Sequence, residues 1–265
     1  MSDYPQTHAD GAMLVDLKGP VAVITLNKPA ARNAMGQAMW IALPRIMDEL
    51  AADDRVQAVL LTGARGHFCA GADVSEFRTT YADAVAARAY NDLVEAGRRA
   101  LTKQPKPTLA ATPGYTVGAG CGLAMACDLR FAEENTRFGM PPAKLGAAYP
   151  LPGVRQLVEL VGPARARDML YSGRMVDAEE ALRIGLADRV FPAEALMEEA
   201  LAYLESVAAL SSNSHRISKT MVGAILDGAD EETSELRALF DSAYISDDFR
   251  EGYSAFLEKR RPVFK

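Results

Sequence analysis

The sequence predicts an α/β core built from repeated ββα units, followed by a region that is almost wholly helical. Short apolar segments of the kind that form strands alternate with longer segments in which apolar residues recur at helical spacing. From residue 154 onward the helical pattern continues alone, and no strand is expected there to extend a sheet. A glycine-rich stretch at residues 114–128 lies between these two parts.

The first predicted element is a β-hairpin. Residues 13–18 and 21–26 are apolar segments on either side of a Gly-Pro turn at Gly19 and Pro20. Asn27 to Pro29 end the second strand. The chain therefore opens, after a short polar tail, with two antiparallel strands.

Helices and single strands then alternate. Residues 34–50 carry apolar side chains at helical spacing and predict an amphipathic helix, kinked or restarted at Pro44. A strand is expected at residues 57–62, a helix at 81–103 and a further strand at 108–112. The glycine-rich segment 63–73, between the first of these strands and the helix, is expected to be a loop.

Four helices are predicted in the C-terminal part of the chain, at residues 196–210, 215–226, 231–241 and 247–260. Ser211 to Ser214 are expected to cap the second of them, and Pro262 to stop the last. With no strands of its own, this region is expected to pack on the core or on another subunit.

The glycine-rich stretch at 114–128 predicts a strand end, a tight turn and a buried helix. Gly118 and Gly120 let the backbone turn sharply or approach a ligand closely. The helix that follows directs free N–H groups at the turn, which suits a negatively charged oxygen. That oxygen could belong to a phosphate or to a carbonyl that becomes an oxyanion, although the stretch has neither a Walker lysine nor a complete G-x-G-x-x-G. Its small residues could equally serve tight packing alone.

Composition indicates an ordinary globular protein. Of the 265 residues 49% are hydrophobic and 24% charged, and the net charge of -6 argues against a nucleic-acid partner. No apolar run approaches the ~20 residues of a membrane span. Cys69, Cys121 and Cys127 are too few and too irregularly spaced for a disulfide framework or a zinc site, so we expect a cytoplasmic protein without a metal.

Several motifs together resemble the enoyl-CoA hydratase/isomerase (crotonase) superfamily, in the right order and over nearly the whole chain. They are residues 24–35, 68–73, 114–128, 138–141, 178–188 and 255–260. The resemblance implies a crotonase-like spiral of ββα turns, an acyl-CoA thioester substrate, and trimers that often pair into hexamers. It implies a core at residues 1–200 with the CoA and acyl sites, and a helical region at 201–265 for oligomerisation and active-site cover. No cofactor beyond the CoA moiety of the substrate is expected.

The resemblance also assigns site residues. The N–H groups of Ala72 and Ala119 would form an oxyanion hole for the thioester oxygen. The residues that would contact CoA are Ala30, Arg32, Ala70 and Asp73, together with Phe256 and Lys259 from a neighbouring subunit. Lys28 and Arg32 could instead be solvated surface charges, and Asp73 could cap its own loop.

Two departures from the family pattern concern the chemistry. Hydratases of this family carry a glutamate where this chain has Gly122 and another where it has Pro142, so the pair of acids that shares the addition of water is missing. Asp128 is expected to be a structural hydrogen-bonding partner. Glu76, which follows the first oxyanion loop, could act as a base but is more simply a solvated charge.

Tyr149 is the remaining catalytic candidate. Its position is similar to a tyrosine of the methylmalonyl-CoA decarboxylase branch, although that branch has a histidine in place of Ala72 and a glutamate in place of Gly122. The phenol could donate a hydrogen bond to a substrate carboxylate or deliver a proton. Alternatively, Tyr149 is an aromatic residue packed under its loop.

We therefore interpret the sequence as that of an acyl-CoA lyase of the decarboxylase kind, or of an isomerase, which works through a thioester enolate. Loss of carbon dioxide from a malonyl-type thioester needs an oxyanion hole and a proton donor but no base. The alternatives are an enoyl-CoA hydratase with an unrecognised acid-base pair, an acyl-CoA hydrolase, and a CoA-binding protein without chemistry.

Overall fold

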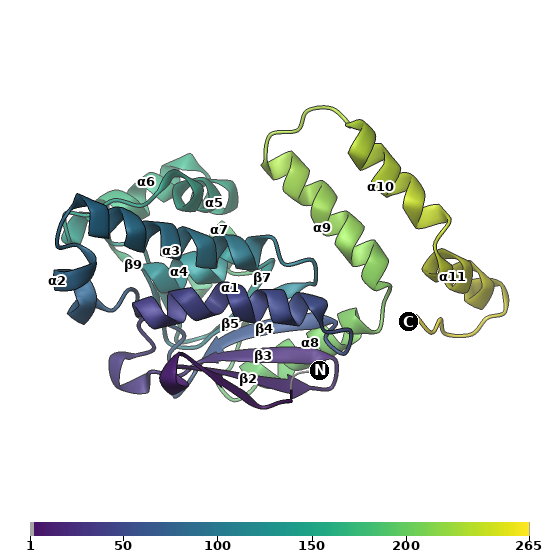
Figure 1. The fold of residues 1–265 in the computed structure, drawn as a ribbon, viewed down its shortest axis with the longest axis horizontal. Coiled ribbons are helices and arrows are strands. Elements are labelled where there is room, and N and C mark those ends of the chain that lie inside the picture. Colours follow the sequence, from purple (N-terminus) through teal and green to yellow (C-terminus); the bar gives the residue numbers. More distant parts are fainter. Residues whose placement is uncertain (1–2, 265) are drawn as a thin grey trace.

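The computed structural model describes residues 3–264 and is built around a seven-stranded sheet (Figure 1). Its strands, in spatial order, are β1 (Gln6–His8), β2 (Met13–Lys18), β3 (Val21–Leu26), β4 (Ala58–Gly63), β5 (Thr108–Thr112), β7 (Leu129–Glu133) and β10 (Arg189–Phe191). The first three strands are antiparallel, and all neighbours from β3 to β10 are parallel. The predicted hairpin and the strand at 108–112 are confirmed with their predicted bounds.

A second sheet of three short strands lies beside the glycine-rich stretch. It consists of β6 (Tyr115–Val117), β8 (Arg137–Gly139) and β9 (Met175–Asp177). The prediction that no strand follows residue 154 is wrong, because β9 joins this sheet and β10 extends the main one. Each of these two strands has only three residues, too few to show a two-residue alternation, and partners on the neighbouring strands define them instead.

Helices cover both faces of the main sheet because the side chains of each strand alternate between the faces. Ala22 and Ile24 of β3 pack with the helices α1 (Gln37–Ala52) and α3 (Ala84–Thr102). Val21 and Val23 pack with α8 (Leu196–Ala208) on the opposite face. Helix α1 starts at Gln37 and continues through Pro44 as one helix, so it is not restarted there.

Short helices complete the core. The buried helix α4 (Ala119–Ala126) follows the glycine-rich turn as predicted, and it packs into an apolar cluster with residues of α5 and α6. The remaining helices of this part are α2 (Phe77–Thr80), α5 (Leu151–Val161), α6 (Pro163–Ser172) and α7 (Ala178–Ile184), with short 3-10 turns η1 (Ala9–Gly11), η2 (Pro29–Ala31), η3 (Val74–Glu76) and η4 (Pro142–Lys144).

The last three helices form what we call the C-terminal arm, residues 212–257, and they lie to one side of the sheet (Figure 1). The arm consists of α9 (Ser212–Leu226), α10 (Ser234–Tyr244) and α11 (Asp247–Leu257). Serine or threonine caps each helix, and the predicted cap is Ser211, whose hydroxyl accepts from the Ser214 N–H.

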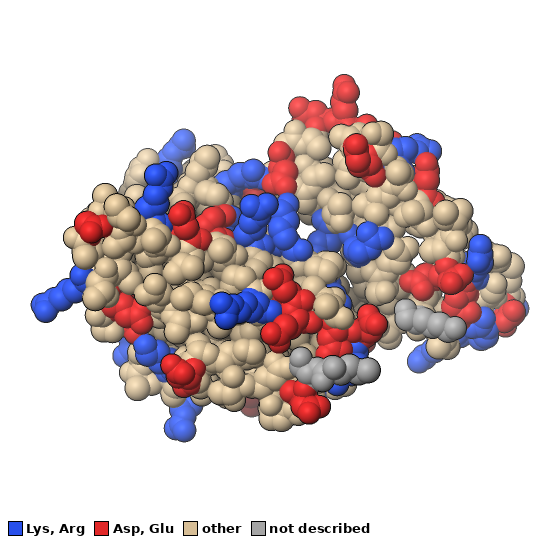
Figure 2. All heavy atoms as spheres, in the orientation of Figure 1, with Lys and Arg blue, Asp and Glu red and all other residues tan. Residues whose placement is uncertain are grey.

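Ion pairs join α9 to the rest of the chain. The Asp227 carboxylate lies 2.9 Å from Lys103 and 3.3 Å from Arg155, and Lys219 lies 2.7 Å from Asp128. Figure 2 shows Lys and Arg side chains gathered where the arm meets the body. Because α10 and α11 continue on the far side of α9, many of their apolar side chains face solvent in a single chain (Figure 1).

Helix α8 crosses the predicted boundary between residues 200 and 201. Leu196, Ala200 and Leu204 are buried against the sheet on both sides of that position. The division of the chain into two domains therefore stays a prediction. Among residues 3–264, none of the helices is long and apolar enough to cross a membrane.

Candidate functional site

Two loops meet beside the start of α4. The Cys69 N–H donates to the Tyr115 carbonyl and the Val117 N–H donates to the Cys69 carbonyl, each at 2.9 Å. A Cβ placed on Gly118, where φ is +58°, would lie 3.6 Å from the Cα of Gly71. These contacts bring together the loop that carries Ala72 and the turn that precedes Ala119.

The N–H groups of Ala72 and Ala119 have no acceptor within the described part of the chain. Around Ala72, the Met35 N–H donates to Gly71 at 2.8 Å and the Asp73 N–H donates to Met35 at 2.9 Å. Because successive residues of an extended segment point their N–H groups to opposite sides, the Ala72 N–H points away from Met35. Ala119 is the first residue of α4, where backbone N–H groups have no partner in the helix. Two fixed donors are thus available to an oxygen that gains negative charge.

Gly120 explains why the stretch needs a very small residue next to the turn. A Cβ at this position would lie 2.3 Å from the carbonyl oxygen of Cys69. Any side chain would therefore push the two loops apart. The close packing that the sequence offered as one alternative is therefore present, and the place for a charged oxygen stays a prediction.

Tyr149 lies beside the same turn. Its phenol oxygen is 3.4 Å from the position that a Cβ on Gly118 would occupy, and its ring packs against the apolar cluster around α4. No residue from 3 to 264 forms a hydrogen bond with the phenol. Burial raises the pKa of Tyr149 well above its usual range, so the phenol keeps its proton at neutral pH. Tyr149 is a packed aromatic residue and also an available hydrogen-bond donor.

The positions that correspond to the family's two glutamates carry no proton donor. Gly122 is in the middle of α4, and Pro142 opens the 3-10 turn η4. Asp128, just beyond the end of α4, is engaged in hydrogen bonds. Asp128 accepts from the Thr108 N–H at 2.8 Å, which confirms its structural role.

Glu76 caps a helix. Its carboxylate accepts from the Gln37 N–H at 2.8 Å, at the start of α1. A Cβ on the preceding residue, Gly36, would lie 2.6 Å from the Glu76 carboxylate oxygen. The pattern gave no signal for this contact, because the two segments are far apart in the sequence.

The loop expected to face the CoA nucleotide is hydrogen-bonded to the segment that leads to Ala72. The Ala70 N–H donates to the Arg32 carbonyl at 2.9 Å, and Ala30 lies in η2 just before it. The Arg32 guanidinium stacks over the Tyr115 ring, 5.0 Å from its centroid. A single tyrosine in a three-residue strand gave no sequence signal for this contact.

Asp73 anchors its own loop, as one of the alternatives held. Its carboxylate accepts from the Ser75 N–H at 3.0 Å and pairs with the Lys28 ammonium. The Lys28 and Ser75 hydrogen bonds hold the pKa of Asp73 below its usual range. Lys28 is therefore engaged in an ion pair and is not a free surface charge.

Phe256 and Lys259 lie apart from these residues within one chain. Phe256 is at the end of α11 on the arm and Lys259 follows the arm directly, whereas the loops of the site lie on the sheet body (Figure 1). Phe256 is 82% exposed. A single protomer does not bring them to the predicted CoA residues.

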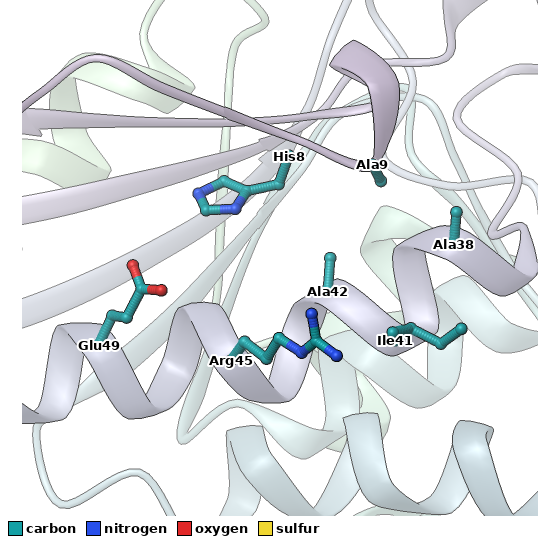
Figure 3. Close-up of a pocket in the computed structure, with 7 residues that line it drawn as sticks. All are labelled: His8, Ala9, Ala38, Ile41, Ala42, Arg45 and Glu49. Atoms are coloured by element: carbon teal, nitrogen blue, oxygen red, sulfur yellow. The ribbon is translucent and has the colours of Figure 1, made fainter.

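A hollow of about 390 Å³ lies elsewhere, between η1 and the outer face of α1 (Figure 3). Its lining residues are His8, Ala9, Ala38, Ile41, Ala42, Arg45 and Glu49. It includes none of the predicted site residues. Within residues 3–264 no three His, Cys, Asp or Glu side chains are grouped as a metal site would require.

Comparison with known proteins agrees with the geometry. The family model for enoyl-CoA hydratase/isomerase matches residues 16–265. A Mycobacterium leprae protein named as an enoyl-CoA hydratase is 38% identical over 254 residues, covering 95% of this chain and 97% of its own. The Escherichia coli 2,3-dehydroadipyl-CoA hydratase is 35% identical over 258 residues, with 96% and 98% covered.

A solved structure is similar over the same length. The crystal structure of an enoyl-CoA hydratase/isomerase family protein from Hyphomonas neptunium has a TM-score of 0.93 and 40% sequence identity, and the match covers 96% of this chain and 97% of that one. The similarity therefore includes the sheet, the glycine-rich stretch and the C-terminal arm together.

Proposed function

The chain belongs to the enoyl-CoA hydratase/isomerase family, and on that premise we propose that it stabilises the enolate of an acyl-CoA thioester at the N–H groups of Ala72 and Ala119. One observation carries the proposal. The two N–H groups lie on loops that touch, and no acceptor among residues 3–264 uses them. Fixed donors of this kind stabilise developing charge without reorganising, and losing one typically costs about 3 kcal/mol of transition-state stabilisation.

The reaction we propose is a decarboxylation or an isomerisation. In the decarboxylation, the bond between the α-carbon and the carboxylate of a malonyl-type thioester breaks, carbon dioxide leaves, and the electron pair forms the thioester enolate. One proton then adds to the α-carbon, from Tyr149 or from water, and solvent restores the proton of the phenol. Support comes from Gly122 and Pro142, which offer no acid for hydration, and from the protonated Tyr149 beside the turn.

The test is turnover of methylmalonyl-CoA in deuterated water, followed by mass spectrometry. We expect carbon dioxide loss with one deuterium at the α-carbon, and a rate about 10²-fold or more lower in Tyr149→Phe, as is typical when a proton donor is removed. Tyr171→Phe is the matched control, because Tyr171 is exposed on α6. Full activity in Tyr149→Phe would remove the phenol from the proposal.

Hydration is the second candidate, because both relatives described above are named as hydratases. Crotonyl-CoA distinguishes the two reactions. Hydration at ~1–1000 per second would overturn the inference from the absent glutamates and point to another acid-base pair. Release of free CoA thiol would indicate a hydrolase, and saturable binding without product a CoA-binding protein.

The proposal extends to the CoA nucleotide and to assembly. We assign the nucleotide to the loop around Ala30, Arg32, Ala70 and Asp73, with Phe256 and Lys259 supplied by a neighbouring subunit of a trimer or hexamer. The support for assembly is the apolar surface of the arm. Its exposed apolar side chains are Val222, Ile225, Leu226, Phe240, Tyr244, Ile245, Phe249, Tyr253, Phe256 and Leu257.

We assign the protein to the cytoplasm because Cys69, Cys121 and Cys127 are free thiols.

A further inference from the structure

Gly122 shares the accessible face of α4 with Ala119. The helix lies wholly within the described residues, and its other six residues are buried. Ala119 and Gly122 are three positions apart, a spacing that places two helical residues on the same side. A ligand held at the Ala119 N–H therefore lies on the face that carries Gly122.

The chain itself gives no reason for glycine at this position. A Cβ on Gly120 would meet the Cys69 carbonyl at 2.3 Å, whereas a Cβ on Gly122 would meet no atom within 4 Å. Gly122 is also not among the glycines with positive φ, so its backbone suits any residue. Glycine inside a helix is less stable than alanine. At Gly122 nothing within the chain offsets this loss of stability, because a side chain there would cause no clash and the backbone forms no turn.

The geometry indicates which part of an acyl group would pass Gly122. Three residues advance about 4.5 Å along a helix, and carbon–carbon bonds are roughly 1.5 Å long. For an acyl chain that runs along α4 from a thioester oxygen at the Ala119 N–H, the carbon atoms nearest Gly122 would be the third carbon and the atoms bonded to it. Tyr149 lies at the other end of this face, near Gly118.

We propose that Gly122 is a specificity-determining residue whose open space admits acyl groups branched at the third carbon. The inference rests on the proposed function, because it uses the Ala119 N–H as the thioester site. The accessible face of α4 consists of Ala119 and Gly122, neither of which has a polar or charged side chain. The branch is therefore a hydrocarbon group and carries no charge.

The test measures binding of two saturated thioesters, butanoyl-CoA and 3-methylbutanoyl-CoA, by titration calorimetry. Neither ligand has a carboxylate to lose or a double bond to hydrate, so the result does not depend on which reaction the enzyme performs. The proteins are the wild type, Gly122→Ala, Gly122→Val, and Gly223→Ala as matched control. Gly223 is a helical glycine on α9 whose Cβ would also meet no atom within 4 Å.

We expect the wild type to bind both ligands with affinities within about threefold of each other. Gly122→Val should weaken binding of 3-methylbutanoyl-CoA at least tenfold relative to butanoyl-CoA, at the lower end of the discrimination that one methylene group gives at a hydrophobic site. Gly122→Ala should shift the selectivity in the same direction by a smaller factor, with an unchanged or higher melting temperature. Gly223→Ala should leave the selectivity unchanged.

Two results would overturn the inference about Gly122 and leave the proposed acyl-CoA site intact. One is a wild type that binds the branched ligand more than tenfold more weakly than the straight one. The other is a pair of Gly122 variants that change both affinities by the same factor or leave both unchanged. If the wild type binds neither thioester, the proposed acyl-CoA site itself fails and the inference fails with it.

Discussion

At the scale of single residues, Asp73 fixes the loop that presents the Ala72 N–H. Its carboxylate accepts from the hydroxyl of Ser75 at 2.6 Å and from the Ser75 N–H, and it pairs with Lys28, which lies between β3 and η2. Asp73 is buried, whereas the Lys28 side chain is 38% exposed. The pair therefore ties two loops of the site together at the edge of solvent.

Removing the cation tests this role through pH. Lys28→Gln should lower the free energy of unfolding by about 1 kcal/mol at pH 7, the upper part of the range for partly exposed pairs. The Asp73 pKa is lowered in the folded state, so the pair stabilises the fold at pH values above the unfolded pKa of ~3.9 and loses that effect as pH falls through the folded value. The difference between wild type and variant should shrink below about pH 4.

Urea unfolding at pH 7, 5 and 3 measures this difference. Lys18→Gln is the control, because Lys18 and its partner Asp16 have side chains that are 58% and 40% exposed, and it should change stability by less than about 0.5 kcal/mol. A loss in Lys28→Gln that is as large at pH 3 as at pH 7 would mean that the lysine stem, and not its charge, stabilises the loops.

Gly120 and Gly122 should respond in opposite ways to the same substitution. Gly120→Ala places a methyl group 2.3 Å from the Cys69 carbonyl and should destabilise the protein by about 1–3 kcal/mol, the usual cost of overpacking. Gly122→Ala meets no atom and should be neutral or stabilising by up to about 1 kcal/mol. Urea unfolding of the two variants compares them directly. Equal stability for wild type and Gly120→Ala would show that this contact does not hold the two loops together.

At the scale of elements, a buried arginine joins β7 to the segment that leads into β10. The Arg130 guanidinium donates to the Leu186 carbonyl at 3.0 Å and to the Cys127 carbonyl at 3.1 Å, and it pairs with Asp188 at 2.8 Å. The Arg130 N–H also donates to Asp188 at 2.7 Å. One side chain thus connects the end of α4, a strand of the main sheet and the approach to its edge strand.

Truncating this arginine should therefore be costly. Arg130→Met removes the donor to the Leu186, Cys127 and Asp128 carbonyls and the cation of the Asp188 carboxylate. It should lower the free energy of unfolding by about 3 kcal/mol, at the low end for broken buried pairs because Asp188 is 31% exposed. Asp188→Asn keeps the arginine and most of its hydrogen bonds, so we expect a smaller loss. Guanidinium unfolding of both variants measures the order, and a larger loss in Asp188→Asn would contradict it.

Elements could be predicted from the sequence where a pattern is long enough to have a period. The hairpin and β5 were predicted with their observed bounds, and α3 and α8 to within a few residues. Strands β9 and β10 were missed because three residues carry no alternation and pairing with neighbours defines them.

The resemblance supplied Ala72, Ala119 and Tyr149, but no pattern could tell that Gly120 is closely packed and Gly122 open. That difference depends on a loop some fifty residues earlier in the chain.

At the scale of the whole molecule, the C-terminal arm is a surface that a single chain leaves uncovered. Neighbouring rings of Phe240, Tyr244, Phe249 and Tyr253 pack edge to face along α10 and α11, with centroids 5.2 to 5.6 Å apart. All four are at least 39% exposed. An apolar patch of this extent on a protein without membrane-spanning helices among its described residues is typical of a protein–protein interface.

The arm therefore predicts both assembly and a shared site. Light scattering should give a mass of three or six times 28.5 kDa, and replacing Ile245 and Phe249 together by glutamate should reduce it to one. If Lys259 of a neighbouring subunit reaches the CoA nucleotide, Lys259→Ala should weaken binding of butanoyl-CoA about tenfold, the effect of about 1.4 kcal/mol. It should leave binding of the butanoyl thioester of pantetheine unchanged, because that ligand lacks the nucleotide.

Two further proteins serve as controls for Lys259→Ala. Lys18→Ala tests the loss of a surface charge, and the monomeric variant should show the same ligand selectivity as Lys259→Ala. A monomer that binds butanoyl-CoA as tightly as the assembled wild type would exclude a contribution from the neighbouring arm.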